Sequence, residues 1–173
     1  ENNTTASFNT AVGYQALYTN TTGSENVALG RLALNQATTA SYNTGIGTNA
    51  LQDNTTGAQN TAVGRSALTN NTTASQNTAL GYQAAYTNTT TDRHTAIGYQ
   101  ALYANSSGIR NTAIGWSALK DNTSGDRCVA VGEQTLLKNT TGNDNTGLGE
   151  GALANNTTGG TNTAVGSSAL ILN

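Results

Sequence analysis

The feature that most constrains this chain is an unbroken internal period of 17 residues. A motif first seen as Asn9-Thr10-Ala11-Val12-Gly13 returns nine more times, and each copy starts 17 residues after the previous one. Because the ten copies contain no insertion or deletion, neighbouring units must keep one geometric register along the chain. A unit of 17 residues is too short to fold alone. The sequence therefore predicts a solenoid with one repeat per coil, and we number the positions of each repeat from 0 at Asn9 to 16.

A few columns define the repeat. Position 3 is always Val, Ile or Leu, position 4 is always Gly, and position 2 is Ala or Gly. Position 7 is Ala except at Thr135, and position 8 is Leu except at Ala85. Position 11 is Asn except at Ala37, and two Thr or Ser residues and a small residue follow it. Such Asn-Thr-Thr-Gly segments favour turns, because their side chains bond to their own backbone and Asn and Gly tolerate positive φ.

An extended segment at positions 1 to 3 would place its columns on two faces. Successive side chains of a strand alternate, so the Thr and aliphatic columns face one way and the Asn and Ala/Gly columns face the other. We predict that the aliphatic column fills the coil interior and that the Ala/Gly column is an outer packing surface. Coils stacked about 4.8 Å apart would form a rod roughly 50 Å long. The Asn columns at positions 0 and 11 would then exchange amide hydrogen bonds along the stack.

The predicted fold class is all-β: a parallel β-solenoid (β-roll) with one 17-residue repeat per coil. Residues 1–173 form a single array of ten coils, expected to be a segment of a longer fibre. A short helical corner is an alternative for residues 14–19, because Tyr14 and Tyr18 have i, i+4 spacing. Each coil offers little apolar surface to offset its ordering entropy, so we expect a homo-oligomer, most simply a trimer.

Composition narrows the classes of partner. Only 9% of the residues are charged, against about 25% in an average soluble domain. The seven Lys and Arg residues are scattered among nine acids, which disfavours nucleic acid, and no apolar run approaches the roughly 18 residues of a membrane span. The single cysteine, Cys128, allows neither an intrachain disulfide nor a multi-cysteine metal site.

Residues able to perform chemistry are few. His94 and Cys128 both occupy the Asn column at position 0, where we interpret them as substitutions within a ladder. Glu133 and Glu150 are neighbours at position 5, where a solvated edge is favoured over a shared cation. We predict no catalytic residue, metal or cofactor, and hence no enzyme.

Two surface features are candidates for binding or modification. Tyr82, Tyr99 and Trp116 occupy position 5 on three successive coils and form a candidate stripe for a receptor or glycan. Asn-x-Ser/Thr sequences recur in the turn column, where we favour a structural role over glycosylation. These candidate acceptors are Asn3, Asn20, Asn54, Asn71, Asn88, Asn105, Asn122, Asn139 and Asn156.

The motif Asn-Thr-Ala-Val-Gly followed by x-x-Ala-Leu resembles the head repeats of trimeric autotransporter adhesins and the related repeats of phage tail fibres. The resemblance covers the whole chain and implies a left-handed parallel β-roll in which three chains pack side by side into a surface-exposed fibre. The 17-residue period and the Leu after the Ala depart from the adhesin heads.

We therefore expect a structural segment, shaft or head, of an extracellular, cell-surface or virion fibre that spaces and adheres to a host or surface glycan. A self-assembling extracellular filament subunit is the alternative, and an ice-binding solenoid, suggested by the Thr columns, is a weaker one. Adjacent residues such as Thr21 and Thr22 would point in opposite directions in an extended chain, which argues against the ice-binding interpretation.

Overall fold

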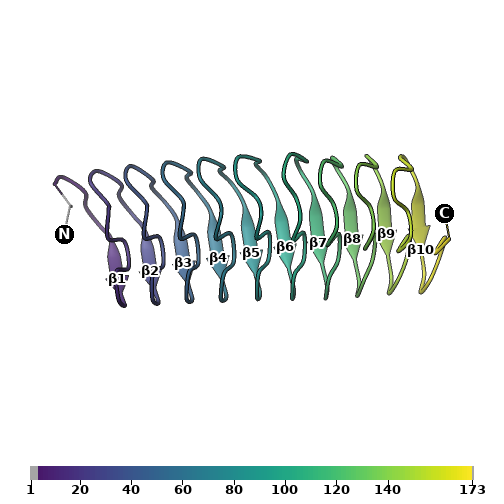
Figure 1. The fold of residues 1–173 in the computed structure, drawn as a ribbon, viewed down its shortest axis with the longest axis horizontal. Helices are drawn as coiled ribbons and strands as arrows, with labels where there is room; N and C mark the ends of the chain where they lie inside the picture. Colours follow the sequence, from purple (N-terminus) through teal and green to yellow (C-terminus); the bar gives the residue numbers. More distant parts are fainter. Residues whose placement is uncertain (1–3, 173) are drawn as a thin grey trace.

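The computed structural model describes residues 4–172 and shows a rod of stacked coils (Figure 1). Each coil contributes one short strand, and the strands form one parallel sheet in chain order from β1 to β10. The strands are β1 (Thr10–Val12), β2 (Val27–Leu29), β3 (Thr44–Ile46), β4 (Thr61–Val63), β5 (Thr78–Leu80), β6 (Thr95–Ile97), β7 (Thr112–Ile114), β8 (Val129–Val131), β9 (Thr146–Leu148) and β10 (Thr163–Val165). The all-β solenoid predicted from the period is confirmed.

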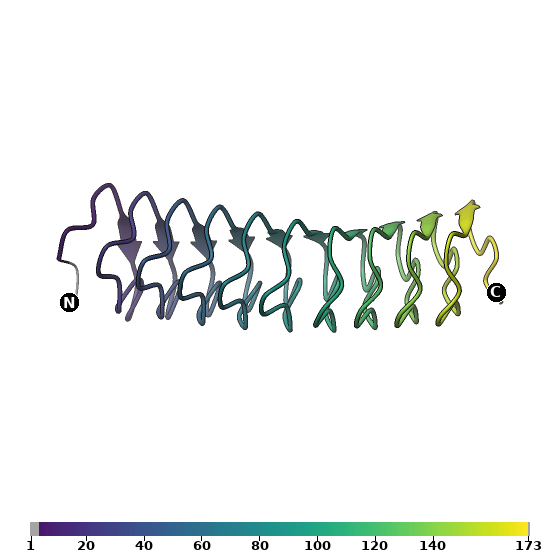
Figure 2. The ribbon, with the colours of Figure 1, turned by 90° about the horizontal axis from the view of Figure 1, so that it is seen from above.

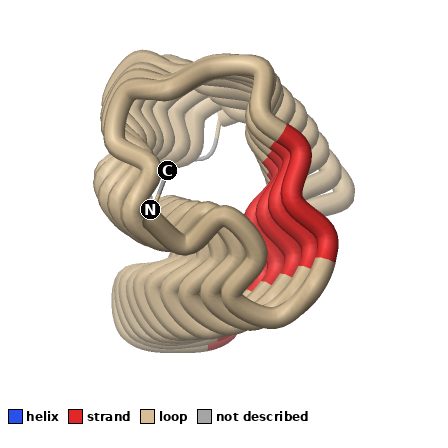
Figure 3. Tube along the Cα trace, turned by 90° about the vertical axis from the view of Figure 1, so that its right-hand side faces the viewer, coloured by secondary structure: helices blue, strands red, loops and turns tan. Residues whose placement is uncertain are grey.

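Strand register follows the repeat without a slip. Ala62 of β4 pairs with Ala79 of β5, and every other pair along the sheet is likewise offset by one repeat. The view along the rod shows the strands behind one another on one side and loops closing the rest of each coil (Figure 3). Residues 14–19 form turns, and residues 4–172 contain no helix, so the alternative of a helical corner is wrong.

The strand's two faces have the opposite orientation to the one predicted. The Ala/Gly column at position 2 is the inner column, and Ala62, Ala79 and Ala96 are fully buried. The aliphatic column at position 3 points outward, with Leu80 48% and Val165 67% exposed. The alternation of the columns was predicted correctly, but the choice of the inner face was wrong.

The reason lies on the far side of the coil, where the Leu column at position 8 fills the interior. Leu51 and Leu68 are fully buried, and they form the core with the Ala columns at positions 2 and 7. A Cβ added to Gly45 at position 2 would lie only 3.2 Å from Cγ of Leu34. The coil is therefore too thin to hold a second large aliphatic column, and the strand can present only Ala or Gly inward.

Left-handed residues turn the chain at fixed positions. Positions 6, 8 and 16 have positive φ in coil after coil, including Leu51 and Leu68 with φ of 51° and 48°. A bulky residue at positive φ is unusual, so the surrounding structure must hold it there. At position 8 the next coil does so: the Leu68 amide donates to the carbonyl of Ala84 at 3.0 Å. Figure 2 shows how these turns repeat along the rod.

Two buried Asn ladders run along the rod, as predicted. At position 0, Oδ1 of Asn43 accepts the backbone N–H of Asn60 in the next coil at 2.9 Å. At position 11, Nδ2 of Asn71 donates to Oδ1 of Asn54 at 2.7 Å. Both columns also donate to the carbonyl at position 14: the amides of Asn43 and Asn54 each lie 2.9 Å from the Gly57 oxygen. The ladders thus bond each coil to the next and close its turn.

Candidate functional sites

The aromatic stripe of Tyr82, Tyr99 and Trp116 lies just after strands β5, β6 and β7 and forms one continuous stack. The ring centroids of Tyr82 and Tyr99 are 5.3 Å apart, and those of Tyr99 and Trp116 are 5.9 Å apart. The Arg65 guanidinium lies 5.7 Å from the centroid of Tyr82 at the other end. Because neighbouring rings cover each other's faces, the stack presents mainly its ring edges to a ligand. A sugar seated flat on each ring does not fit this arrangement.

A second aromatic stack at position 9 was not singled out from the sequence. Tyr86 and Tyr103 lie with centroids 5.4 Å apart and an interplanar angle of 5°. These two rings connect the coils of β5 and β6, as do Tyr82 and Tyr99. The signal was present in the sequence as a 17-residue separation of two tyrosines.

The candidate glycosylation asparagines lie inside the coil. Asn20, Asn54, Asn71, Asn88, Asn105, Asn122, Asn139 and Asn156 are at most 2% exposed, and Asn3 lies outside the described residues. The Nδ2 atom to which a glycan would be attached donates to the carbonyl at position 14, as from Asn122 to Gly125 at 3.0 Å. The geometry therefore supports the turn role of these residues over glycan attachment.

Glycan attachment can be tested by secretion from a eukaryotic host. We expect the buried acceptors, such as Asn54 and Asn122, to stay unmodified in the folded fraction, because their side-chain amides are buried and hydrogen-bonded. The matched control is Gln59→Asn, which creates an acceptor sequence on an exposed residue whose φ of 60° suits Asn. Peptide mass mapping should show hexose units at the Gln59→Asn site of the control and none at the buried acceptors, and glycans on those buried acceptors in folded wild-type chains would contradict the structural role.

His94 replaces Asn at position 0 and continues the ladder as predicted. Its Nδ1 accepts the backbone N–H of Asn111 at 3.2 Å, so the proton of the neutral ring is on Nε2. Nε2 lies 3.0 Å from Oγ1 of Thr91, which donates to Oδ1 of Asn88. Burial lowers the pKa of His94 to about 4, against the smaller opposing effects of its hydrogen bonds and of the Asp92 and Asp126 carboxylates. The imidazole is therefore a neutral structural group.

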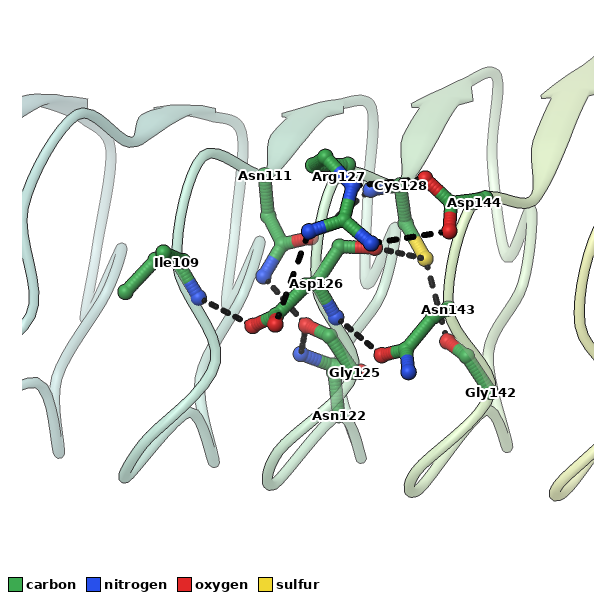
Figure 4. Close-up of polar contacts among 10 residues, drawn as sticks. All are labelled: Ile109, Asn111, Asn122, Gly125, Asp126, Arg127, Cys128, Gly142, Asn143 and Asp144. Atoms are coloured by element: carbon green, nitrogen blue, oxygen red, sulfur yellow. Dashed lines mark hydrogen bonds and ion pairs between the residues drawn. The ribbon is translucent and has the colours of Figure 1, made fainter.

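Cys128 occupies the same column beside a surface ion pair (Figure 4). Its backbone N–H donates to Oδ1 of Asn111 at 2.9 Å, and its thiol donates to the Gly142 carbonyl at 3.2 Å, where other coils use an Asn amide. Burial raises the pKa of the thiol, so Cys128 is protonated and buried, which suits packing and disfavours a nucleophile.

The neighbouring Arg127 forms a two-pronged ion pair on the surface. Its Nε and Nη2 atoms lie 2.7 and 2.9 Å from the two carboxylate oxygens of Asp144. This hydrogen bonding lowers the pKa of Asp144. The pair is exposed and joins two successive coils, so its role is structural at the surface.

The remaining acids do not converge. Glu133 and Glu150 are exposed and follow Trp116 along position 5, and neither forms an ion pair within the described residues. Across residues 4–172, no three His, Cys, Asp or Glu side chains gather in a way that could hold a metal ion. The same residues include no helix long and apolar enough to cross a bilayer.

The largest surface feature is the outer face of the sheet, which we call the strand face and define as positions 1 and 3 of all ten coils. Position 1 is Thr or Val and position 3 is Val, Ile or Leu, so this face contains no charged residue. Its aliphatic side chains are exposed or half-buried along the whole sheet, including Val12 at 57% and Leu148 at 47%. Contiguous apolar surface of this kind typically marks an interaction site.

No known protein family, curated protein or solved structure matches this chain. Its class is accordingly defined by the fold itself, which is a parallel β-solenoid repeat protein.

Proposed function

We propose that this chain is a structural segment of an extracellular or virion-surface fibre, in which copies associate through their strand faces. The observation that carries the proposal is the uninterrupted, uncharged aliphatic column on one side of the rod. The resemblance of the repeat to adhesin heads and phage tail fibres points to the same class of function. Spacing, with adhesion at the surface, is the task that such a rod serves.

A second copy of the chain is the occupant that best fits the strand face. The face has the same two columns along the whole sheet, so two or three parallel copies in register bring aliphatic side chains against aliphatic side chains in every coil. Burying them gains about 25 cal/mol for each Å² of apolar surface. The absence of charge on positions 1 and 3 removes the electrostatic cost of bringing identical faces together.

The mass of the folded protein in solution tests this association. We expect sedimentation to give a defined oligomer, most simply a trimer, and expect the double variant Leu80→Lys, Leu148→Lys to be monomeric. Both leucines are nearly half exposed in the single chain, so lysine there leaves the coil intact but places charge in the interface. The control Thr56→Lys, Thr141→Lys adds the same charge on exposed turn residues and should remain oligomeric.

Circular dichroism must show that all three proteins keep the wild-type β signal. A wild-type chain that stays monomeric at its highest soluble concentration would overturn the association. Electron microscopy of the wild type separates the alternatives, because a fibre segment has one length and a self-assembling filament has many.

One observation keeps ice binding as a second candidate. The structure places a column of threonines on the exposed strand face, at Thr10, Thr44, Thr61, Thr78, Thr95, Thr112, Thr146 and Thr163. The hydroxyls from Thr44 to Thr112 form a row with one hydroxyl per coil, and Val27 and Val129 interrupt the column on either side of it. Adjacent threonines such as Thr21 and Thr22 lie in the turns instead. Thermal hysteresis that is lost in Thr78→Tyr, Thr112→Tyr would favour this function over association.

A further inference from the structure

We propose that the two stacked tyrosine pairs, Tyr82 with Tyr99 and Tyr86 with Tyr103, are sites of oxidative cross-linking that join the coils of β5 and β6 through dityrosine bonds. The oxidant is an external one-electron oxidant of the peroxidase and hydrogen peroxide class. The inference is independent of the proposed function, because it concerns bonds within one chain.

The structure holds both pairs ready for coupling. The ring centroids are 5.3 and 5.4 Å apart, and the interplanar angles are 16° and 5°. All four rings are half-buried or exposed, so an oxidant reaches them and each ring can rotate about its Cβ–Cγ bond. Such a rotation turns stacked rings edge to edge and brings the carbons ortho to the two hydroxyls together.

The chemistry needs no further group from the protein. Each phenol loses one electron and one proton to become a phenoxyl radical, whose unpaired electron is shared with the ortho carbons. A bond forms between one ortho carbon of each ring, and the hydrogens of those carbons move to the two oxygens, which restores both phenols. Each link therefore releases two electrons and two protons, and one hydrogen peroxide accepts them and becomes two water molecules.

The tyrosine pairs lie at a junction between coils that a covalent link would stabilise. Ala85, in the coil of β5, is the one interruption of the Leu column at position 8, between Leu68 and Leu102. The smallest side chain of the position 8 column is therefore in the β5 coil, which contributes one ring to each tyrosine pair. With only one cysteine, the chain has no disulfide to hold this junction. A covalent link outside the coil would offset the reduced apolar contact within it.

The three other tyrosines provide an internal comparison. Tyr14, Tyr18 and Tyr42 have no stacked aromatic partner within residues 4–172. They are as exposed as the paired residues or more so, with Tyr14 at 67%. Preorganisation, rather than access to the oxidant, should therefore select the products.

The test is oxidation of the purified chain of residues 1–173 by peroxidase and limiting hydrogen peroxide. We expect dityrosine fluorescence in chains that keep monomer mobility on a denaturing gel. Peptide mass spectrometry should find Tyr86 linked to Tyr103 and Tyr82 linked to Tyr99, with two hydrogens lost per link. Tyr86→Phe should remove about half of the intrachain signal and Tyr82→Phe, Tyr86→Phe nearly all of it, because each removes one member of a pair.

The matched control Tyr14→Phe, Tyr42→Phe removes two unpaired rings and should leave the intrachain signal unchanged. Oxidation in denaturant should abolish the selectivity for the two pairs. The proposal is overturned if the double variant Tyr82→Phe, Tyr86→Phe forms as much intrachain dityrosine as the wild type. Dityrosine found only between chains, or at unpaired tyrosines, would also overturn it.

Discussion

Gly64→Ala is expected to lower the free energy of unfolding by about 4 kcal/mol. Gly64 has a φ of +132°, which an L-residue rarely adopts, and an added Cβ would lie 2.5 Å from the Gly81 carbonyl oxygen and 2.7 Å from its carbon. These are backbone atoms of the next coil, so no side chain can move aside to relieve the contact. The change must separate two coils or distort both. Denaturant unfolding at fixed protein concentration measures the loss.

Gly151→Ala is the matched control in the same fold. Gly151 also has positive φ, at +64°, but the nearest atom to an added Cβ is Oγ of Ser168, 3.7 Å away. The other copies carry Gln, Leu, Asn or Ser at this position. We expect the free energy of unfolding to change by less than about 1 kcal/mol. Equal losses in the two variants would show that contact between coils is not what requires glycine at position 4.

Acid should destabilise the rod through His94. Its pKa in the folded chain is about 4, below the ordinary value of 6.5. The unfolded chain therefore takes up a proton as the pH falls through 6.5, whereas the folded chain does not until about pH 4. The stability that the neutral His94 side chain contributes is therefore fully present above pH 6.5 and is lost progressively below it. At about 1.4 kcal/mol for each pH unit between 6.5 and about 4, the loss is about 3 kcal/mol.

The variant Thr91→Gly, His94→Asn tests this assignment, because it restores the residues found at these positions in other coils. Urea unfolding of both proteins from pH 7 to pH 4 should show a steeper loss of stability in the wild type. Asp92 and Asp126 are present in both proteins, so a difference between the two curves is assigned to the exchanged residues. If the two curves stay parallel, another group is responsible for the acid sensitivity.

The sequence allowed the repeating backbone to be predicted better than the packing around it. Alternation along Thr61, Ala62 and Val63 correctly separates the two faces of a strand, and the constant period predicts the parallel register. Hydrophobicity alone then assigns Val63 to the interior, which is wrong. The interior is already occupied by Leu68 from the opposite side of the coil, and its width depends on the left-handed residues that bend the chain there. The width of the coil interior cannot be predicted from any column of the repeat.

For the candidate sites too, the repeat predicts which residues are neighbours but not how their side chains pack. The stacking of Tyr82, Tyr99 and Trp116 follows from the period, because one repeat brings equal positions together. That the rings cover each other's faces depends on side-chain geometry. Thr91 stands where the other turns have Gly or Ala, and His94 stands where most coils have Asn. Only the turn geometry shows that the two side chains contact each other. The aliphatic strand face was missed because its residues were assigned to the core.

Uniform register has a consequence for the evolution of length. Every coil meets its neighbours through the same strand pairing, offset by one repeat, as between Ala28 and Ala11 or Ala164 and Gly147. Inserting or deleting a whole unit by recombination between repeats leaves each remaining junction chemically intact, whereas any other change in length breaks one. Recombination in such a gene can therefore change the length of the rod in fixed steps of about 4.8 Å, one step for each coil gained or lost.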